Sequence, residues 1–405
     1  MLAVFCIVNF LQIGNLQEVR EHTEDVRRKR GSDHMPSAPL NTGTAAQIPK
    51  SSKSKRRRSH DIPIPAVLPD GKVSADLSKD ILQFAVVGFA KCGTTFLLKN
   101  VFGASRYLNM GRNREIHDLE HRTVKKFLRH YRGQVNATTE DGYPILNGYK
   151  SPSALESEQS LWYLEQYFPA TKFIVGVRHP ISRFQSWYNF KLARMAENIP
   201  MPPIEHTIGQ CHELCDAFPN ETCVSKNTTY YPIRGCSEDA NYQYFFSRLG
   251  WTPRTSEREL SLLNHHTLTI HNFSQAKLFV VEAEQIKETN PERANRVFGD
   301  LETYLGLPTL SLPRVDSTKD KSSSARYKAA YHEREGMTKA KQAQLLDICK
   351  PQRGKLRQYL LEIGTNAADW IEEFFLPSPH VVVSNHTEFV EAIRKWKIDP
   401  CISKS

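Results

Sequence analysis

The sequence predicts an α/β fold, with one domain built on a central parallel sheet flanked by helices. Three short apolar runs indicate buried strands, and they span Phe84 to Val87, Lys172 to Val177 and Leu278 to Val281. Each run is four to six residues long and rich in β-branched or aromatic residues, which favours a strand over a helix. Strands of a parallel sheet are buried on both faces, and for that reason they read as continuous apolar runs.

Helical patterns separate the predicted strands, as the crossover connections of a parallel sheet require. We expect helices over 96–102, 155–168, 295–305 and 339–363, and another that begins at Pro180. The stretch 199–238 has no clear period and is predicted to be an insertion. The predicted organisation is a signal peptide or truncated signal-anchor at 1–15, a basic flexible stem at 16–80, the folded domain at 81–375 and a C-terminal tail at 376–405.

Composition narrows the class of protein. Apolar residues make up 40% of the 405 residues and charged residues 24%, which excludes wholesale disorder. No apolar run approaches the roughly 20 residues of a membrane-spanning helix, which excludes a polytopic membrane protein. The net charge is +10, and residues 1–60 hold 11 Lys and Arg against 5 Asp and Glu. The rest of the chain, after residue 60, is mildly basic, as expected of a protein that binds an anionic ligand.

Basic runs at 27–30 and 55–58 are compatible with a nuclear signal, a polyanion-binding patch or a processing site. We interpret them as solvated charge of the stem and expect no nucleic-acid partner.

Three features point to the secretory pathway. Leu2 to Ile13 is apolar except at two positions, which is the length of a signal-peptide core. Asn-x-Ser/Thr acceptors for glycosylation occur more often than chance predicts, at Asn136, Asn220, Asn227, Asn272 and Asn385. Four cysteines crowd into one polar stretch, namely Cys211, Cys215, Cys223 and Cys236. They predict a disulfide-linked loop whose pairing stays open, with a zinc site that includes His212 as the rival. Attachment to a membrane through the N-terminus and cleavage of that segment both remain open.

A P-loop-like turn follows the first predicted strand, from Gly88 to Thr95. A strand–loop–helix turn offers free backbone N–H groups and the positive end of a helix dipole to an anion. In a nucleoside-triphosphatase loop, Lys and then Ser or Thr follow the second Gly directly. Here Thr94 follows Gly93, and Lys91 lies three residues before Thr94. The order predicts a phosphate cradle that works without a metal ion.

This loop resembles the 5′-phosphosulfate loop of sulfotransferases, which use 3′-phosphoadenosine 5′-phosphosulfate (PAPS) as the sulfuryl donor. The second signature of that family is an Arg at a strand end with a Ser eight residues later, and here Arg178 and Ser186 match it. A guanidinium fork and a hydroxyl group suit a terminal phosphate. The resemblance implies that Arg178 and Ser186 bind the 3′-phosphate, and that the loop binds the 5′-phosphosulfate through Lys91, Cys92, Gly93, Thr94 and Thr95. Lys91 is the expected cation at the leaving oxygen.

Two further segments resemble the Golgi-lumenal, carbohydrate-acting (heparan-sulfate-type) branch of the family. In the first, Glu115 matches the position of the catalytic base, and His117 is the rival because the cytosolic branch employs a His. In the second, Lys150 matches a residue that positions the acceptor and the transferred group. A basic segment at 319–326 is a candidate for a third donor contact, which stays open.

The predicted function is therefore sulfuryl transfer from PAPS to a hydroxyl or an amine of a glycan or glycoprotein acceptor in the Golgi lumen. The alternatives are a cytosolic-type small-molecule sulfotransferase, a protein-tyrosine sulfotransferase, an ATP-dependent phosphotransferase and a non-catalytic polyanion-binding protein. The position of Lys91 disfavours the phosphotransferase.

Overall fold

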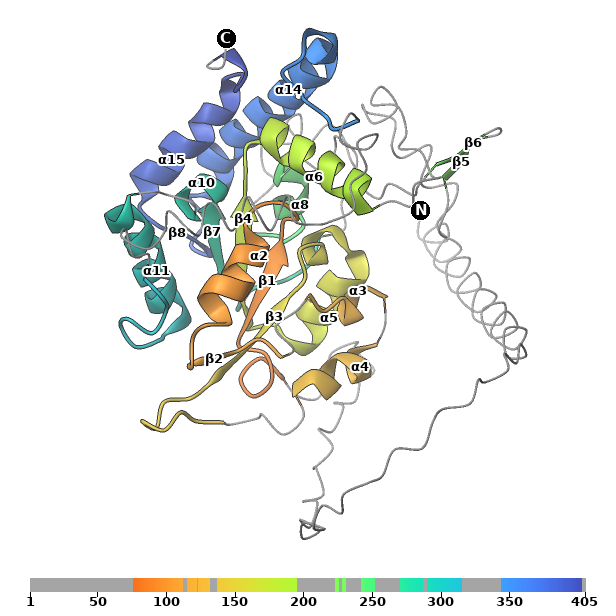
Figure 1. Cartoon of the computed structure of the whole chain (residues 1–405). Coiled ribbons are helices and arrows are strands. Elements are labelled where there is room, and N and C mark those ends of the chain that lie inside the picture. The colour runs from red at the N-terminus through yellow and green to blue at the C-terminus, as the bar shows by residue number, and fades with distance from the viewer. Residues whose placement is uncertain are drawn as a thin grey trace, which may run out of the picture. The chain divides into compact units, whose positions relative to one another are not determined.

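The structure is a computed structural model, and it describes residues 76–111, 115–121, 123–131, 137–194, 223–225, 228–230, 242–251, 270–286, 290–314 and 344–402. Within these ranges the centre is a six-stranded sheet with the strand order β2-β3-β1-β4-β7-β8 (Figure 1). Every neighbouring pair in it is parallel. The strands are β1 (Phe84–Gly88), β2 (Leu108–Asn109), β3 (Leu146–Lys150), β4 (Lys172–Val177), β7 (Leu278–Glu282) and β8 (Val381–Val383). The α/β class and the central parallel sheet predicted from the sequence are confirmed.

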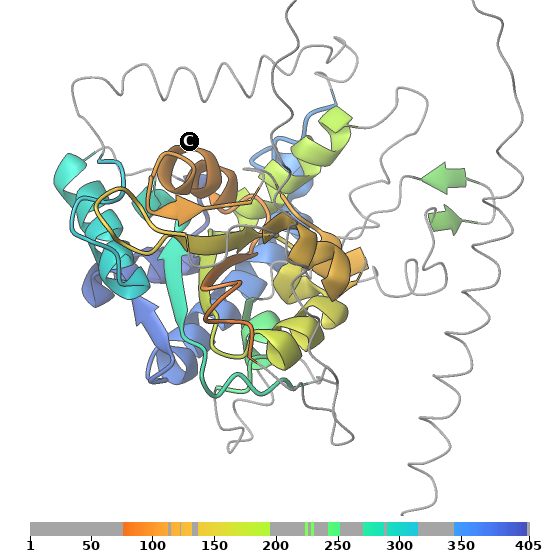
Figure 2. The ribbon, with the colours of Figure 1, turned by 90° about the horizontal axis from the view of Figure 1, so that it is seen from below.

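Alternate residues of the central strands pack on opposite faces of the sheet. In β1, Ala85 and Val87 belong to one buried cluster, while Phe84 and Val86 belong to another. The first cluster includes side chains of α5 (Glu158–Tyr167), α8 (Tyr242–Ser247), α14 (Gly354–Trp370) and α15 (His386–Arg394). The second includes side chains of η1 (Leu97–Phe102) and α11 (Pro291–Leu305). Figure 2 shows helices on both sides of the sheet, and this double coverage explains the continuous apolar runs.

The expected helices exist with shifted ends. The helix expected at 96–102 divides into α2 (Thr94–Phe96) and η1, which is a π-helix. The helix expected at 155–168 is α5, and the one expected at 295–305 is α11. The Asn290 side chain caps the start of α11, and Gly306 ends it with a φ of 79°. The helix that Pro180 opens is α6 (Pro180–Arg194).

The prediction of one helix over 339–363 is wrong for residues 344–350, and residues 339–343 lie outside the described part of the chain. Residues 344–350 form turns, and the helix α14 begins at Gly354 after a short 3₁₀ turn, η6 (Pro351–Arg353). The cause is Pro351, because a proline disfavours helical geometry in the residue before it. Lys350 is accordingly extended, with φ −60° and ψ 140°.

The C-terminal segment predicted as a tail after residue 375 is part of the fold. β8 pairs with β7, so that Leu278 lies opposite Val381 and Val280 opposite Val383, and α15 packs beside it. A strand of three valines is too short to give a periodic signal, which is why the sequence did not predict it. The strand β3 was also missed, since its polar residues Asn147 and Lys150 interrupt the apolar pattern although both are buried.

Several sequence predictions lie outside the described residues. They include residues 1–75, the cysteines at 211, 215 and 236, the acceptors at 136, 220 and 227, and the basic segment at 319–326. Cys223 begins the short strand β5 (Cys223–Ser225), which pairs in antiparallel fashion with β6 (Thr228–Tyr230). A disulfide that the sequence did not predict joins Cys349 to Cys401. None of the helices in the described part of the chain is long and apolar enough to cross a membrane.

Candidate active site

The phosphate-binding loop connects β1 to α2 and crosses the end of the neighbouring strand β4. The Phe89 N–H donates to the Gly176 carbonyl at 3.0 Å. Gly176 permits this crossing, since a Cβ atom there would lie 2.3 Å from the Cys92 carbonyl oxygen. Two loop residues adopt left-handed backbone geometry, Lys91 with a φ of 70° and Gly93 with a φ of 83°. The glycine adopts it without steric cost, and the geometry turns the chain into the helix.

The second predicted signature packs directly against this loop. Arg178 follows the end of β4, and α6 then carries Arg183 and Phe190 to the loop. Arg183 Nε donates to the Ala90 carbonyl at 3.2 Å, and Lys91 Nζ lies 4.0 Å from the centroid of the Phe190 ring. Lys91 and Arg178 therefore lie at the same carboxyl edge of two adjacent parallel strands, where α/β sheets bind ligands.

One further observation indicates that Arg178 is suited to bind an anionic ligand. Its Nε is buried and has no hydrogen-bond partner among the described residues. A buried, unpaired guanidinium donor is costly, and such a group in a native structure requires an explanation. An anion at this edge of the sheet would supply the missing acceptor. Ser186 lies two turns into α6 and is half-buried.

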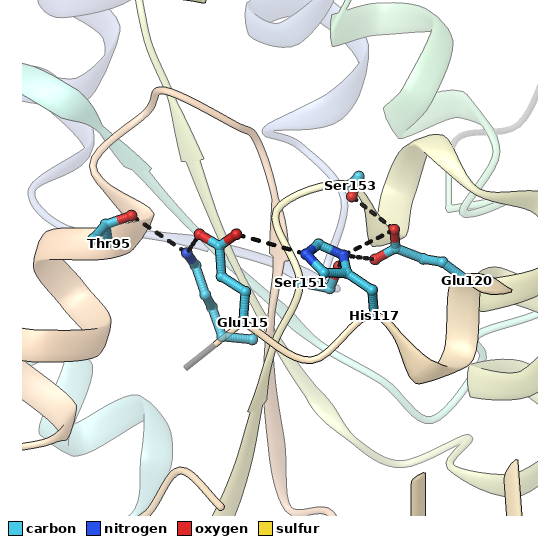
Figure 3. Close-up of polar contacts among 7 residues, drawn as sticks. Thr95, Glu115, His117, Glu120, Ser151 and Ser153 are labelled. Atoms are coloured by element: carbon cyan, nitrogen blue, oxygen red, sulfur yellow. Dashed lines mark hydrogen bonds and ion pairs between the residues drawn. The ribbon is translucent and has the colours of Figure 1, made fainter. Parts of the chain in front are cut away.

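A second group of polar residues surrounds Lys150, the last residue of β3. Figure 3 labels its other members, which are Thr95, Glu115, His117, Glu120, Ser151 and Ser153. The Lys150 side chain is fully buried and forms an ion pair with Glu115. Its ammonium also donates to Thr95 Oγ1 at 3.4 Å, and Thr95 belongs to the phosphate-binding loop. The predicted acceptor residues are thus in contact with the predicted donor loop.

His117 lies between two carboxylates. Its Nε2 is 3.6 Å from Glu115, and its Nδ1 is 3.1 Å from both oxygens of Glu120. Glu120 is buried, with only 4% of its side chain exposed, and it accepts a hydrogen bond from Ser153 Oγ at 2.8 Å. Ser151 Oγ lies 3.2 Å from His117 Nδ1 (Figure 3).

These contacts set the charge of the group. The hydrogen bond from His117, together with the Lys150 ammonium, lowers the pKa of Glu115 to about 2. The hydrogen bonds to Glu115 and Glu120 raise the pKa of His117 to about 9. Burial lowers the pKa of Lys150, and Glu115 opposes that shift. At neutral pH, Glu115 is a carboxylate that can accept a proton, whereas His117 is an imidazolium that cannot. This charge state favours Glu115 over His117 as the base.

The structure places the sequence-predicted residues in two groups that the loop connects. One group contains Lys91 and Arg178 at the carboxyl edge of β1 and β4, and the other surrounds the end of β3. Thr95, Glu115, His117 and Lys150 are linked by the contacts above. Gly93 and Thr94 start the helix after the loop. Cys92 is buried and its thiol faces the Tyr242 hydroxyl at 3.6 Å, so that only its backbone is left to face a ligand.

Sequence reasoning missed Glu120, Ser151, Ser153, Arg183 and Tyr242. Glu120 had one weak signal, its spacing of three residues from His117 at the start of α3 (Asp118–His121). The others contact the site through packing of distant segments, for which a single sequence carries no signal. In the described part of the chain, no cluster of three or more His, Cys, Asp or Glu residues is arranged to hold a metal ion.

Comparisons with known proteins give a family match and similar solved structures. The family model described as Sulfotransferase family matches residues 110–362, a span that includes Glu115, Lys150 and Arg178. A solved structure of a sulfotransferase from Alicyclobacillus acidocaldarius is similar at 14% sequence identity, covering 72% of this chain and 96% of that chain with a TM-score of 0.42. No curated protein matches the chain in sequence.

Proposed function

The chain belongs to the sulfotransferase family, and on that premise we propose that it sulfates a hydroxyl or an amine of a carbohydrate acceptor in the Golgi lumen. Membership of the family makes it an enzyme that takes its sulfuryl group from PAPS. The carbohydrate acceptor, the compartment and the roles of individual residues are the proposal. The contact of Lys150 with both Glu115 and Thr95 is the observation that carries the proposed residue roles, since it joins the proposed acceptor-side base to the proposed donor loop.

The donor supplies an activated sulfuryl group whose transfer leaves an anionic phosphate. In the proposed arrangement, the N–H groups of the loop and Lys91 hold the 5′ end, and Arg178 with Ser186 holds the 3′-phosphate. Cations and oriented N–H groups at these positions stabilise charge that develops on the leaving oxygen. Binding of one ligand at both its 5′ end and its 3′-phosphate also fixes its orientation for an in-line transfer.

Glu115 acts as the base in this proposal, although its pKa of about 2 makes it a weak one before the donor binds. Part of that shift comes from the Lys150 ammonium. An anionic group that draws this ammonium away from Glu115 raises the pKa of Glu115 towards its ordinary value. The carboxylate thereby becomes a stronger base when the donor is present.

The proposed compartment is supported by features outside the site. The Cys349–Cys401 disulfide is typical of proteins that fold in an oxidising environment, which the secretory lumen provides. Asn272, one of the predicted glycosylation acceptors, is exposed. If the chain passes through the lumen, treatment with a glycosidase that removes N-linked glycans should increase its electrophoretic mobility. Unchanged mobility, with residues 349 and 401 present as free thiols, would favour the cytosolic alternative.

The acceptor is tested by offering the full chain ³⁵S-labelled PAPS with a panel of glycans, small phenols and tyrosine-containing peptides. The proposal expects label on glycans and none above background on the phenols and peptides. Label on the peptides or phenols alone would overturn the carbohydrate acceptor. Donor affinity that is unchanged in both Lys91→Ala and Arg178→Ala would overturn the proposed donor site.

A further inference from the structure

Tyr242 is the first residue of α8, and its hydroxyl lies between the two donor-binding segments. The side chain is fully buried. The hydroxyl donates to the Arg178 carbonyl at 2.7 Å and accepts from the Arg178 N–H at 3.2 Å. It also lies 3.6 Å from Cys92 Sγ in the phosphate-binding loop. One phenol thus fixes both backbone groups of Arg178 and touches the neighbouring loop.

The ring of Tyr242 belongs to an aromatic contact that reaches the same loop. Its centroid is 4.9 Å from that of Phe89, the second residue of the turn. The Arg183 guanidinium lies 5.1 Å from the Phe89 ring and 5.4 Å from the Tyr242 ring. Arg183 also donates to the Ala90 carbonyl at 3.2 Å and pairs with Glu156 at 3.1 Å. A cation between two aromatic faces, with a hydrogen bond to the loop, ties α6, α8 and the loop together.

We propose that Tyr242 is a positioning residue for the donor, one that holds the backbone of Arg178 at a fixed place relative to the phosphate-binding loop. The inference rests on the proposed donor site, because it assigns Tyr242 a role that acts through Arg178. Tyr242 touches no reacting atom in this arrangement. It fixes the position of the Arg178 backbone, from which the guanidinium side chain extends, directly after the end of β4.

The chemistry of the hydroxyl suits this role at all physiological pH values. Burial raises the pKa of Tyr242 well above its ordinary value, so that the phenol keeps its proton and remains a donor to Arg178. Burial likewise raises the pKa of Cys92, whose thiol stays protonated. The contact does not switch with pH, as expected of a fixed support.

The chain offers a matched control in Tyr304 of α11. Its hydroxyl is also buried and donates to two backbone carbonyls, that of Phe173 at 2.9 Å and that of Lys277 at 2.6 Å. Phe173 lies near the start of β4, whereas Arg178 follows its end. Tyr304→Phe and Tyr242→Phe therefore remove similar hydrogen bonds from opposite ends of the same strand.

The experiment measures binding of two nucleotides to the full chain by calorimetry, 3′-phosphoadenosine 5′-phosphate and adenosine 5′-phosphate, which lacks the 3′-phosphate. Loss of one or two hydrogen bonds predicts that Tyr242→Phe weakens binding of the first nucleotide by about three- to tenfold. Binding of the second should change less than twofold. Tyr304→Phe should lower the unfolding temperature by a similar amount and leave both affinities unchanged.

A double-mutant cycle separates this inference from the proposed donor site. Arg178→Ala should remove the preference for the 3′-phosphorylated nucleotide, and Tyr242→Phe should add no further loss in that background. If Arg178→Ala leaves the preference intact, the donor site itself is wrong. If Arg178→Ala removes it but Tyr242→Phe behaves like Tyr304→Phe, the donor site stands and the role of Tyr242 is overturned.

Arg183→Lys tests the other part of this arrangement, the link between α6 and the loop. Lysine keeps a cation near the two rings but loses the Nε donor to Ala90. Because Ala90 belongs to the loop that is proposed to hold the 5′ end, this variant should weaken binding of both nucleotides, and a loss confined to the 3′-phosphorylated nucleotide would contradict this division of roles.

Discussion

Lys150 shows how one residue determines the charge of the proposed site. Its side chain is fully buried at the end of β3, and its partner Glu115 has 42% of its side chain exposed. A buried ammonium without a partner is strongly destabilising, and this ion pair is therefore necessary for stability as well as for orientation. The exposed side of Glu115 remains accessible to an acceptor. The same carboxylate can thus hold Lys150 and receive a proton.

Replacement of Glu115 by Gln tests its role as the base. Gln keeps the shape and an acceptor oxygen for Lys150 but cannot take a proton, and turnover should fall at least about 100-fold. Affinity for 3′-phosphoadenosine 5′-phosphate should not fall, since its proposed contacts, Lys91, Arg178 and Ser186, are unchanged. Glu388→Gln is the control, because Glu388 pairs with Arg296 away from the site. Turnover within a few fold of the wild type would place the base on another residue.

The pH profile of kcat/KM tests the charge of His117. Its pKa is raised from 6.5 to about 9, so the imidazolium and its hydrogen bond to Glu115 are present at neutral pH and are lost as pH rises through about 9. Glu115, with a pKa lowered to about 2, stays ionised through the acid range. We expect a flat profile from pH 5 to 8 and a rise near 9, because neutral His117 no longer lowers the pKa of Glu115 and leaves it a stronger base. His117→Gln should remove this rise. A rise in activity between pH 6 and 7 would instead identify His117 as a base that must lose its proton.

At the scale of elements, the phosphate-binding loop depends on the strand beneath it. Gly176 lies in β4 at the point where the loop crosses it. The neighbouring strands β1 and β4 pair with Phe84 opposite Lys172. A register slip between Val86 and Gly88 marks the point where β1 leaves the ladder to enter the loop. Irregularities of this kind commonly re-aim the chain beside active sites.

Two glycine-to-alanine variants separate close packing from general backbone effects. Gly176→Ala places a Cβ 2.3 Å from a backbone oxygen of Cys92, so the loop must shift, and donor affinity should fall at least tenfold with a loss of stability. Gly299→Ala, in the interior of α11, meets no atom within 4 Å. It should stabilise the protein by roughly 0.5–1 kcal/mol through helix propensity. Urea unfolding and nucleotide titration measure both variants, and normal donor affinity in Gly176→Ala would contradict the crossing.

At the scale of the whole molecule, the disulfide links the C-terminal segment to the turns before α14. Both sides of this link contact α6, the helix that carries Ser186. Leu346 and Ile348 pack with Phe184 and Trp187 of α6, and Cys349 and Cys401 border the same cluster. The Ile398 carbonyl lies 3.1 Å from His179 Nε2, directly after Arg178. The C-terminal segment thereby packs against α6, the helix proposed to bind the donor.

Removal of this disulfide should lower stability without removing a catalytic group. Closing a loop of 52 residues is worth about 4 kcal/mol in the chain-entropy account. For Cys349→Ala with Cys401→Ala, a loss of that size corresponds to an unfolding temperature lower by several degrees. Dithiothreitol should lower the unfolding temperature of the wild type in the same way and leave the double variant unchanged. Equal sensitivity of both proteins to the reductant would show that another disulfide is responsible.

The amino-acid sequence by itself determined the α/β class, the three central strands and the residues of the two donor signatures. Each of these is a local property, because an apolar run and the loop that follows it lie within about 15 residues of one another. The sequence also pointed to Glu115, Lys150 and Arg178 through a resemblance; the family comparison supports the family, while the roles of these residues stay predictions.

Only the tertiary structure decided which of these groups meet. The contact of Lys150 with Glu115 spans 35 residues, that of Tyr242 with Arg178 spans 64, and the disulfide spans 52. The edge strands β2 and β8, the interior strand β3 and the true start of α14 also became visible only there. The physical reason is that such contacts are fixed by the packing of segments on a common sheet, and a polar residue buried by that packing looks in the sequence like any residue exposed to water.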